Sequence, residues 1–394
     1  MENDKKNALS PVAEKVTSFD SLYDGLKKSC KNVRWKDSVV GYESRGLRAT
    51  YKLQEALRSG DYQIQGYQRF RIFEPKERRI VATRIRDRQF QHSLVDNYVY
   101  PQVTKSFIRD NHACQKGRGV DDCLNRMTRH LRKYYQKYGC EGWVLKCDIH
   151  HYFESVPHDK AKEAFGKLLQ DEWCKKKVFD IIDSFNQDGT ETGVDSSYSD
   201  GKSEYDDFRG LGLGSQISQL CGLVLLNDLD HYIKEVLHIE AYSRYMDDLI
   251  LVDHDKEHLR YCRDEIERKL HDLGLTLNKK TGLFPLKNGV IILKWRFVLT
   301  KSGAVKRIMN REKITHQKKK VTKILDRESH GMCEPGTADA SMQSWMANAK
   351  RGDSFSERCE MARIYCELSG GKRYHDYIKS GTKDSTSGSN SKTV

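Results

Sequence analysis

Apolar and polar positions follow a clear pattern in residues 239–252, IEAYSRYMDDLILV. Two apolar runs rich in β-favouring residues flank a short polar tip, Met246-Asp247-Asp248, which predicts a β-hairpin with adjacent carboxylates at its turn. Neighbouring Asp side chains at a tight turn repel each other, and a divalent cation would relieve that repulsion. Carboxylate oxygens suit Mg²⁺ or Mn²⁺. The alternative is an ordinary solvated turn, because Asp is common in turns.

A second apolar strand is predicted in residues 143–153, WVLKCDIHHYF, where Asp148 ends the apolar part. A carboxylate at the end of a buried strand is costly unless it is paired or binds metal, so Asp148 is the candidate third carboxylate. His150 and His151 also suggest a metal site. Adjacent side chains of an extended chain point to opposite faces, however, and this disfavours ligation by the pair.

Residues 62–82 alternate around the sequence Glu74-Pro75-Lys76-Glu77, which predicts another β-hairpin. Its basic side chains include Arg71, Lys76, Arg78 and Arg79. Arg gives bidentate contacts to phosphate and Lys a point charge, so the hairpin could close over a triphosphate. An exposed basic ribbon without that role is the alternative.

Helical periodicity predicts helices in residues 120–134, 168–185 and 259–273, and from the glycine-rich segment 210–219 to about residue 237. A strand pair containing Trp295 is expected in residues 290–299. Before the first of these helices, residues 107–119 form a loop rich in glycine and basic residues. Its backbone amides, Lys116 and Arg118 could hold a phosphate strand.

The character of the chain changes after residue 305, where basic side chains crowd a predicted helix with a thin apolar stripe. This pattern favours contact with a nucleic-acid backbone, independent of sequence and sensitive to salt, although a solvated basic helix is the alternative. The basic residues are Lys306, Arg307, Arg311, Lys313, Lys318, Lys319, Lys320 and Lys323, and the stripe is Ile314, Val321, Ile324 and Leu325.

Composition and charge narrow the class of protein. The chain has 394 residues, a net charge of +13 and a pI of about 9.1, which favours nucleic acid over membrane as the polyanionic partner. None of the eleven Cys residues forms a CxxC pair, so a zinc ribbon is disfavoured and reduced thiols in a cytoplasmic protein are expected. The first ten residues contain no apolar signal core, and no apolar run approaches transmembrane length.

The three carboxylates together fit two-metal phosphoryl transfer, in which two ions lie about 3.5–4 Å apart. Tyr245-Met246-Asp247-Asp248 resembles the YxDD box of reverse transcriptases, and the strand that carries Asp148 resembles their motif A. Residues 210–219 resemble the motif between these two. Lys279 and Lys280 lie in the region of motif D, and residues 293–297 resemble the primer grip. From about residue 67 to 299 the chain is therefore similar to a prokaryotic reverse transcriptase.

This resemblance implies an α+β fold with the right-hand architecture of polymerases. Fingers and a palm with an antiparallel sheet would occupy residues 61–300, including a mobile insertion at about 186–208. A helical lead-in would precede them in residues 1–60. A basic helical thumb would follow in residues 301–369, and residues 370–394 would form a disordered tail.

The resemblance also implies roles for individual residues. Two Mg²⁺ ions, or Mn²⁺, would be held by the catalytic Asp148, Asp247 and Asp248 together with Ile149. Phe153 would be the aromatic gate against a 2′-hydroxyl, Lys279 would protonate the leaving pyrophosphate, and Lys76 and Arg79 would grip the triphosphate. The remaining nucleotide-binding candidates are Leu213, Gly214 and Gln219. Nucleic acid would be bound by Lys116, Arg118, Trp295, Lys318, Lys319 and Lys320.

The expected activity is RNA-directed DNA synthesis, with an RNA template, a DNA or RNA primer and dNTPs as partners. One difference from the usual motif indicates which group of reverse transcriptases the chain resembles. Residues 213–219 give LGxxxSQ, whereas retroviral and group II intron enzymes usually carry QGxxxSP. LGxxxSQ resembles the error-prone enzymes of diversity-generating retroelements, which work with a small basic accessory protein. An antiviral defence enzyme making untemplated or protein-primed DNA, alone or with a structured non-coding RNA, is also compatible. A catalytically idle, maturase-like RNA-binding protein is a further alternative.

Overall fold

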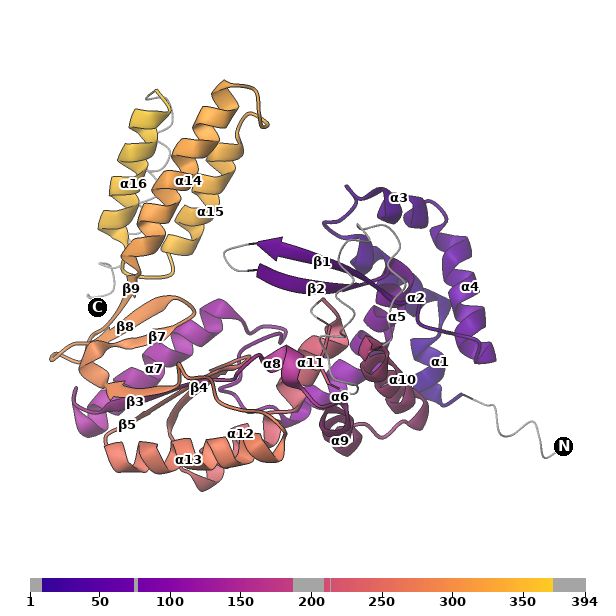
Figure 1. The fold of residues 1–394 in the computed structure, drawn as a ribbon, viewed down its shortest axis with the longest axis horizontal. Helices are drawn as coiled ribbons and strands as arrows, with labels where there is room; N and C mark the ends of the chain where they lie inside the picture. Colours follow the sequence, from indigo (N-terminus) through magenta and orange to yellow (C-terminus); the bar gives the residue numbers. More distant parts are fainter. Residues whose placement is uncertain (1–8, 74–76, 187–208, 213, 371–394) are drawn as a thin grey trace, which may run out of the picture. The chain divides into compact units, whose positions relative to one another are not determined.

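The structure is a computed structural model that describes residues 9–73, 77–186, 209–212 and 214–370 (Figure 1). The chain divides into two compact units. The first contains residues 1–119, 145–251 and 257–282, and the second contains residues 120–144, 252–256 and 283–394. The predicted mobile loop and C-terminal tail lie almost wholly outside the described residues, and Lys76 and Leu213 lie outside them as well. The predicted domain limits stay predictions.

Helices dominate the N-terminal part of the first unit. Ser18 caps α2 by accepting a hydrogen bond from the Ser21 amide, as a Ser at this position is expected to do. Helix α2 packs closely on α5, and Gly25 permits this approach because a Cβ there would lie 2.3 Å from the Gln89 carbonyl oxygen. The elements are α1 (Pro11–Val16), α2 (Phe19–Cys30), α3 (Asp37–Glu43), α4 (Gly46–Ser59), α5 (Ile85–Leu94), the π-helix Val95–Val99, α6 (Tyr100–Val103) and the 3₁₀-helix Thr104–Ser106.

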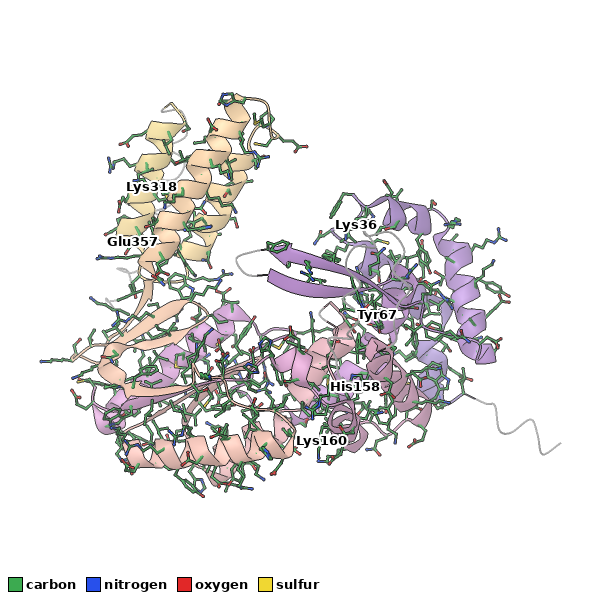
Figure 2. All side chains as sticks on the ribbon, viewed as in Figure 1. Lys36, Tyr67, His158, Lys160, Lys318 and Glu357 are labelled. Atoms are coloured by element: carbon green, nitrogen blue, oxygen red, sulfur yellow. The ribbon has the colours of Figure 1, made fainter. Side chains whose placement is uncertain are left out.

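The predicted hairpin of residues 62–82 is confirmed. Strands β1 (Tyr67–Phe73) and β2 (Glu77–Thr83) pair antiparallel, with Tyr67 opposite Thr83 and Phe73 opposite Glu77. The buried Tyr67 anchors the base of this hairpin, because its hydroxyl lies 2.6 Å from Ser184 Oγ (Figure 2).

A four-stranded sheet in the order β4-β5-β3-β6 carries the predicted carboxylates. Its strands are β3 (Trp143–Asp148), β4 (Ala241–Tyr245), β5 (Asp248–Asp253) and β6 (Gly282–Pro285). The hairpin predicted in residues 239–252 is confirmed. The apolar side chains of β5 are fully buried, as are Leu259, Cys262, Ile266 and Leu270 on α13 (Lys256–Asp272). Burial raises the pKa of Cys147 on β3 to about 12. Cys262 and Glu267 of α13 add to this rise.

The strand predicted to end at Asp148 does end there, but the extended conformation expected for His150 and His151 was wrong. His151 adopts a left-handed φ of 44° that turns the chain into α8 (Tyr152–Ser155). The single helix expected up to residue 237 is three segments: α11 (Gln216–Val224), α12 (Asn227–His231) and the π-helix Tyr232–Val236. Between these regions lie α9 (His158–Leu168), α10 (Glu172–Asp183) and the 3₁₀-helix Ser184–Asn186.

The second unit combines a small antiparallel sheet with helices. Strands β7 (Val290–Ile292), β8 (Trp295–Leu299) and β9 (Val305–Met309) pair in that order, and α7 (Val120–Tyr138) contacts β8 and β9. Helix α14 (Arg311–Ser329) contacts both α15 (Thr337–Ala349) and α16 (Phe355–Leu368), as Figure 1 shows in orange and yellow. The short 3₁₀-helix Leu286–Asn288 precedes β7.

The expectation that Lys306 and Arg307 belong to the basic helix was wrong. Both residues lie in β9, where they pair with Val298 and Phe297 of β8. Asn310 then starts α14 by accepting a hydrogen bond from the Glu312 amide. The eleven cysteines, which all lie among the described residues, form no disulfide with one another. Across the described residues, no helix has the length and apolar character needed to cross a membrane.

Candidate active site

Asp247 lies in a two-residue turn between β4 and β5. Residues 241–244 and 249–252 are buried, and this burial fixes the register of the hairpin and leaves the carboxylates at its tip. Met246 begins the turn with a φ of 57°, a left-handed conformation that costs about 1 kcal/mol for a residue with a Cβ. The Met246 carbonyl oxygen accepts a hydrogen bond of 3.1 Å from Arg244 Nη1, which holds the turn.

The structure brings Asp148 to this turn. Asp148 is the last residue of β3, Asp248 is the first residue of β5, and these two strands are neighbours in the sheet. The Asp148 amide donates to Thr281 Oγ1 over 3.2 Å, and its carbonyl accepts from the Asn278 amide over 2.7 Å. Lys146 Nζ, on the same strand as Asp148, lies 3.2 Å from Asp248 Oδ1.

The charges of Asp148 and Asp248 act on the carboxyl group of Asp247. Burial raises the pKa of Asp247 above its ordinary value, and the charges of Asp248 and Asp148 raise it further. A hydrogen bond from its own backbone amide and the charge of Lys146 lower it in part. The ionised form of Asp247 is therefore disfavoured, and a nearby cation would stabilise it.

The chemistry of these side chains fits a hard divalent cation, because all the donors are carboxylate oxygens. No group of three or more His, Cys, Asp or Glu side chains lies in metal-binding geometry within the described part of the chain. The fit therefore rests on the type of donor and on the repulsion among them. Ile149 is buried and forms a bridge with Leu277, which fixes the backbone next to Asp148.

Phe153 lies on α8, five residues after Asp148, and is half-buried. Its ring packs beside that of Tyr152, with centroids 5.4 Å apart. A Cβ on Gly222 of α11 would lie 3.3 Å from both rings, so the rings pack directly on this glycine. The Phe153 carbonyl accepts a 2.7 Å hydrogen bond from the Leu211 amide, which brings the glycine-rich segment to the same place.

The other nucleotide-binding candidates are placed unevenly. Gly214, with a φ of 117°, and Gln219 are exposed at the start of α11. Lys279 is exposed, and its neighbour Asn278 donates to the Asp148 carbonyl, so its backbone lies beside the carboxylate strand. Lys76 and Leu213 lie outside the described residues, and for Arg79 only the backbone is described.

The candidate phosphate-binding loop is closed by its own contacts. Arg118 Nη1 donates to the carbonyls of Ile108 and Asn111, each over 2.8 Å. Lys116 Nζ lies 5.0 Å from the centroid of the Tyr100 ring and remains largely exposed. Arg118 thus shapes the loop, whereas Lys116 extends from it.

In the second unit, Lys318, Lys319 and Lys320 are exposed on α14, and Lys318 is labelled in Figure 2. Only Gln317 and Val321 of this helix are buried, which agrees with the thin apolar stripe seen in the sequence. Trp295 is 1% exposed. The Trp295 side chain is thus buried on β8, and contact between Trp295 and a primer stays a prediction.

A buried ion pair beside the candidate site escaped the sequence analysis. Arg244 of β4 and Asp230 of α12 are both 0% exposed, and two hydrogen bonds of 2.6 and 2.7 Å join them. Tyr242 donates to the same carboxylate over 2.6 Å. The only signal in the sequence was a charged residue within each of two apolar segments, where a buried charge requires a partner.

A family model described as reverse transcriptase (RNA-dependent DNA polymerase) matches residues 74–287. A search of curated proteins found no match.

Solved telomerase structures are also similar to this chain. The apo telomerase from Candida tropicalis truncated from its C-terminal domain is 12% identical with a TM-score of 0.46, covering 62% of this chain and 55% of that one. Telomerase from Candida albicans with a TWJ fragment of telomeric RNA is 12% identical with a TM-score of 0.43, covering 89% of this chain and 69% of that one. This chain thus spans about half of the first structure's length.

The family match extends over more than half of the 394 residues. It includes the strand of Asp148, the gate candidate Phe153 and the hairpin with Asp247 and Asp248. The chain belongs to the reverse transcriptase family.

Proposed function

We propose that this protein is an RNA-directed DNA polymerase that extends a primer along an RNA template. The observation that carries the proposal is the placement of Asp148 and Asp248 on neighbouring strands and of Asp247 in the adjoining turn, where the charges of the other two disfavour ionised Asp247. Such a set of carboxylates fits two divalent ions, Mg²⁺ or Mn²⁺. When bound, two such ions activate the attacking hydroxyl and stabilise the leaving oxygen.

The chain's own residues then bind and orient the substrates. Phe153 lies on α8, five residues after Asp148, where its ring would exclude a nucleotide with a 2′-hydroxyl. Lys76 and Arg79 would hold the triphosphate, and Lys279, beside the backbone of Asp148, would give a proton to the leaving pyrophosphate. Gly214 and Gln219, exposed at the start of α11, would line the base pair with Leu213.

Nucleic acid would be held by positive charge in each unit. Lys116 extends from the loop that Arg118 closes, and Lys318, Lys319 and Lys320 form a basic face on α14. Template and primer backbones are uniformly anionic, so these contacts require no particular sequence. RNA template, primer and dNTPs are therefore the proposed partners.

The biological role that we favour is that of an error-prone retroelement enzyme. Residues 213–219, with Leu where related enzymes carry a polar residue, support this branch. A defence role with a different primer or template is the second candidate, because residues 213–219 are also compatible with it. The intact set of three Asp residues favours a catalytic protein over an idle maturase-like one.

The double variant Asp247→Asn and Asp248→Asn tests the activity. Asn keeps the size of Asp but removes the charge that binds the metal, so primer extension on RNA should fall below detection while the circular dichroism spectrum is unchanged. A matched control is Asp228→Asn, since Asp228 is an exposed carboxylate on α12 that pairs with Lys167. Undiminished synthesis by the double variant would refute the proposal.

A further inference from the structure

The side chain of Arg244 on β4 forms hydrogen bonds with several separate parts of the candidate site. It is fully buried, and its guanidinium forms two hydrogen bonds with the Asp230 carboxylate. Neutralising Asp230 uses Nε and one hydrogen bond of Nη2. The remaining donors point to backbone carbonyls: Nη2 to Leu223 over 3.2 Å, and Nη1 to Met246 over 3.1 Å and to Gly222 over 3.4 Å.

One of these contacts, the hydrogen bond to the Met246 carbonyl, lies in the turn that carries Asp247. Met246 has a left-handed φ of 57° and immediately precedes Asp247. Without its hydrogen bond to Arg244, the Met246 peptide could rotate toward a relaxed conformation. Such a rotation would move the Asp247 carboxylate relative to Asp148, because the side chain follows its own backbone.

A second contact reaches the gate. The Gly222 carbonyl that Arg244 approaches also accepts a 2.8 Å hydrogen bond from Tyr152 Oη. The rings of Tyr152 and Phe153 pack on the α-carbon of the same glycine. The position of Phe153 is therefore tied to Arg244 through a single peptide group of α11.

The backbone of Arg244 is fixed as well. Its amide donates to the Asp110 carbonyl over 2.9 Å, and its carbonyl accepts from the His112 amide over 3.1 Å. The loop that carries Lys116 thus docks on this residue. With both main chain and side chain bound, Arg244 has little freedom to shift, which makes it a suitable anchor.

We propose that Arg244 is a positioning residue that sets the Asp247 turn and the Phe153 gate together, so that metal affinity and sugar discrimination both depend on it. The proposal rests on the proposed polymerase function for the meaning of the gate. The predicted effect of Arg244 on metal affinity does not rest on that function, because metal binding is measured without any DNA synthesis.

Arg244→Lys is the main test. Lys keeps a positive charge opposite Asp230 but cannot also reach the Gly222 and Met246 carbonyls, since its donors share one nitrogen. We expect the affinity for Mn²⁺, measured by electron paramagnetic resonance, to fall about tenfold, as is typical when a residue supporting metal ligands is lost. The preference for dNTP over NTP in primer extension should fall by a similar factor of about ten.

Tyr242→Phe is the matched control. It removes one hydrogen bond to the same Asp230 carboxylate, on the same strand, but touches neither Gly222 nor Met246. It should lower the thermal midpoint as a loss of buried hydrogen bonding does, with Mn²⁺ affinity and sugar preference unchanged. If Arg244→Lys behaves like this control, Arg244 serves stability alone and the proposal is refuted.

Tyr152→Phe separates the two contacts and keeps the proposal testable if Arg244→Lys does not fold. Removing the hydroxyl frees the Gly222 carbonyl on the gate side only. The dNTP preference should fall several-fold while Mn²⁺ affinity stays at the parent value. An unchanged preference would refute the link to the gate. A parent protein that makes no DNA on RNA would instead refute the proposed function. The Mn²⁺ affinity of Arg244→Lys would still show whether Arg244 positions the turn that carries Asp247.

Discussion

The Asp247 carboxylate is disfavoured in its charged form by burial and by the charges of Asp248 and Asp148. A side chain chosen for stability alone would not carry that charge here. Carboxylates that destabilise the metal-free protein are expected where a cation is to be bound, because the energy of binding offsets their repulsion. At the scale of single residues, the site is thus organised for charge neutralisation.

This reasoning predicts the effect of Asp247→Asn on stability. In chelator near pH 7.5, the variant should melt at a higher temperature than the parent, by about 1 °C for each kcal/mol of repulsion that is relieved in a chain of this size. The raised pKa means that ionisation costs more in the folded than in the unfolded state, and this cost is complete only above the folded pKa. The advantage of the variant should therefore disappear as the pH falls below the ordinary pKa of Asp. Equal melting at every pH would contradict the prediction.

Phe153→Ala tests the gate at the same scale. Removing the ring would open space beside Gly222, so the use of ribonucleotides relative to deoxynucleotides should rise about tenfold or more, as when a shape-selective contact is lost. The measurement is primer extension with each nucleotide type at matched concentrations. Phe355→Ala, which removes an exposed ring on α16, is the control and should leave discrimination unchanged. Equal discrimination in variant and parent would place the gate elsewhere.

Single residues were predictable where a local pattern exposed them. Asp247 and Asp248 were visible because two apolar strands flank them, and Asp148 because it ends an apolar run. Asp230 and Arg244 were not, because their pairing joins α12 to β4 and depends on the packing of the whole sheet. A sequence shows the local alternation of apolar and polar residues. It does not show which residues from distant elements come into contact.

The secondary-structure elements show the same division. Both hairpins were predicted, since alternation and turn residues act within a few positions. The break between α11 and α12 and the change to a π-helix at Tyr232 were not predicted, because Leu226, Leu229 and Ile233 continue the apolar period through them. Arg307 was assigned to a helix, whereas its pairing with Phe297 places it in β9.

Helix α14 is the element on which nucleic-acid binding is best tested. Changing Lys318, Lys319 and Lys320 to Ala should weaken binding of a template–primer duplex and lower the slope of log K against log salt by about 2–3, since each phosphate contact contributes about one. The measurement is fluorescence anisotropy at several salt concentrations. A control with the same change in charge replaces Lys27, Lys160 and Lys175, each paired with an acidic residue on its own helix. If both triple variants keep the parent's slope, α14 is simply a solvated basic helix.

At the scale of the whole molecule, the division into two units was not apparent in the sequence. Residues 120–144 belong with the C-terminal part because α7 is tied to it at long range: Arg351 binds Asp121, and Arg307 binds Asn125. The sequence gives no local sign of such contacts. The net charge of +13, in contrast, is apparent in the sequence and favours a polyanionic partner such as nucleic acid.

The fidelity of the product is a property of the whole polymerase, and it distinguishes the two proposed roles. Leu213 stands where related enzymes carry a polar residue, and Leu can pack against a base pair but cannot form a hydrogen bond with it. Loss of one such contact is worth about 1–3 kcal/mol of discrimination, which is about 5-fold to 150-fold in error rate. We therefore expect frequent misincorporation, and the resemblance to the enzymes of diversity-generating retroelements implies that it is most frequent opposite template adenines.

Sequencing cDNA made on one RNA by the parent and by Leu213→Gln measures this directly. The variant should regain accuracy at adenines, because the amide restores a donor and an acceptor beside the nascent pair. Ile217→Val is a conservative control four residues further along, at a buried position of α11, and it should keep the parent's error spectrum. If parent and Leu213→Gln copy adenines as accurately as other bases, Leu213 is a packing variant. The error-prone retroelement role would then be wrong, and the defence role would be favoured.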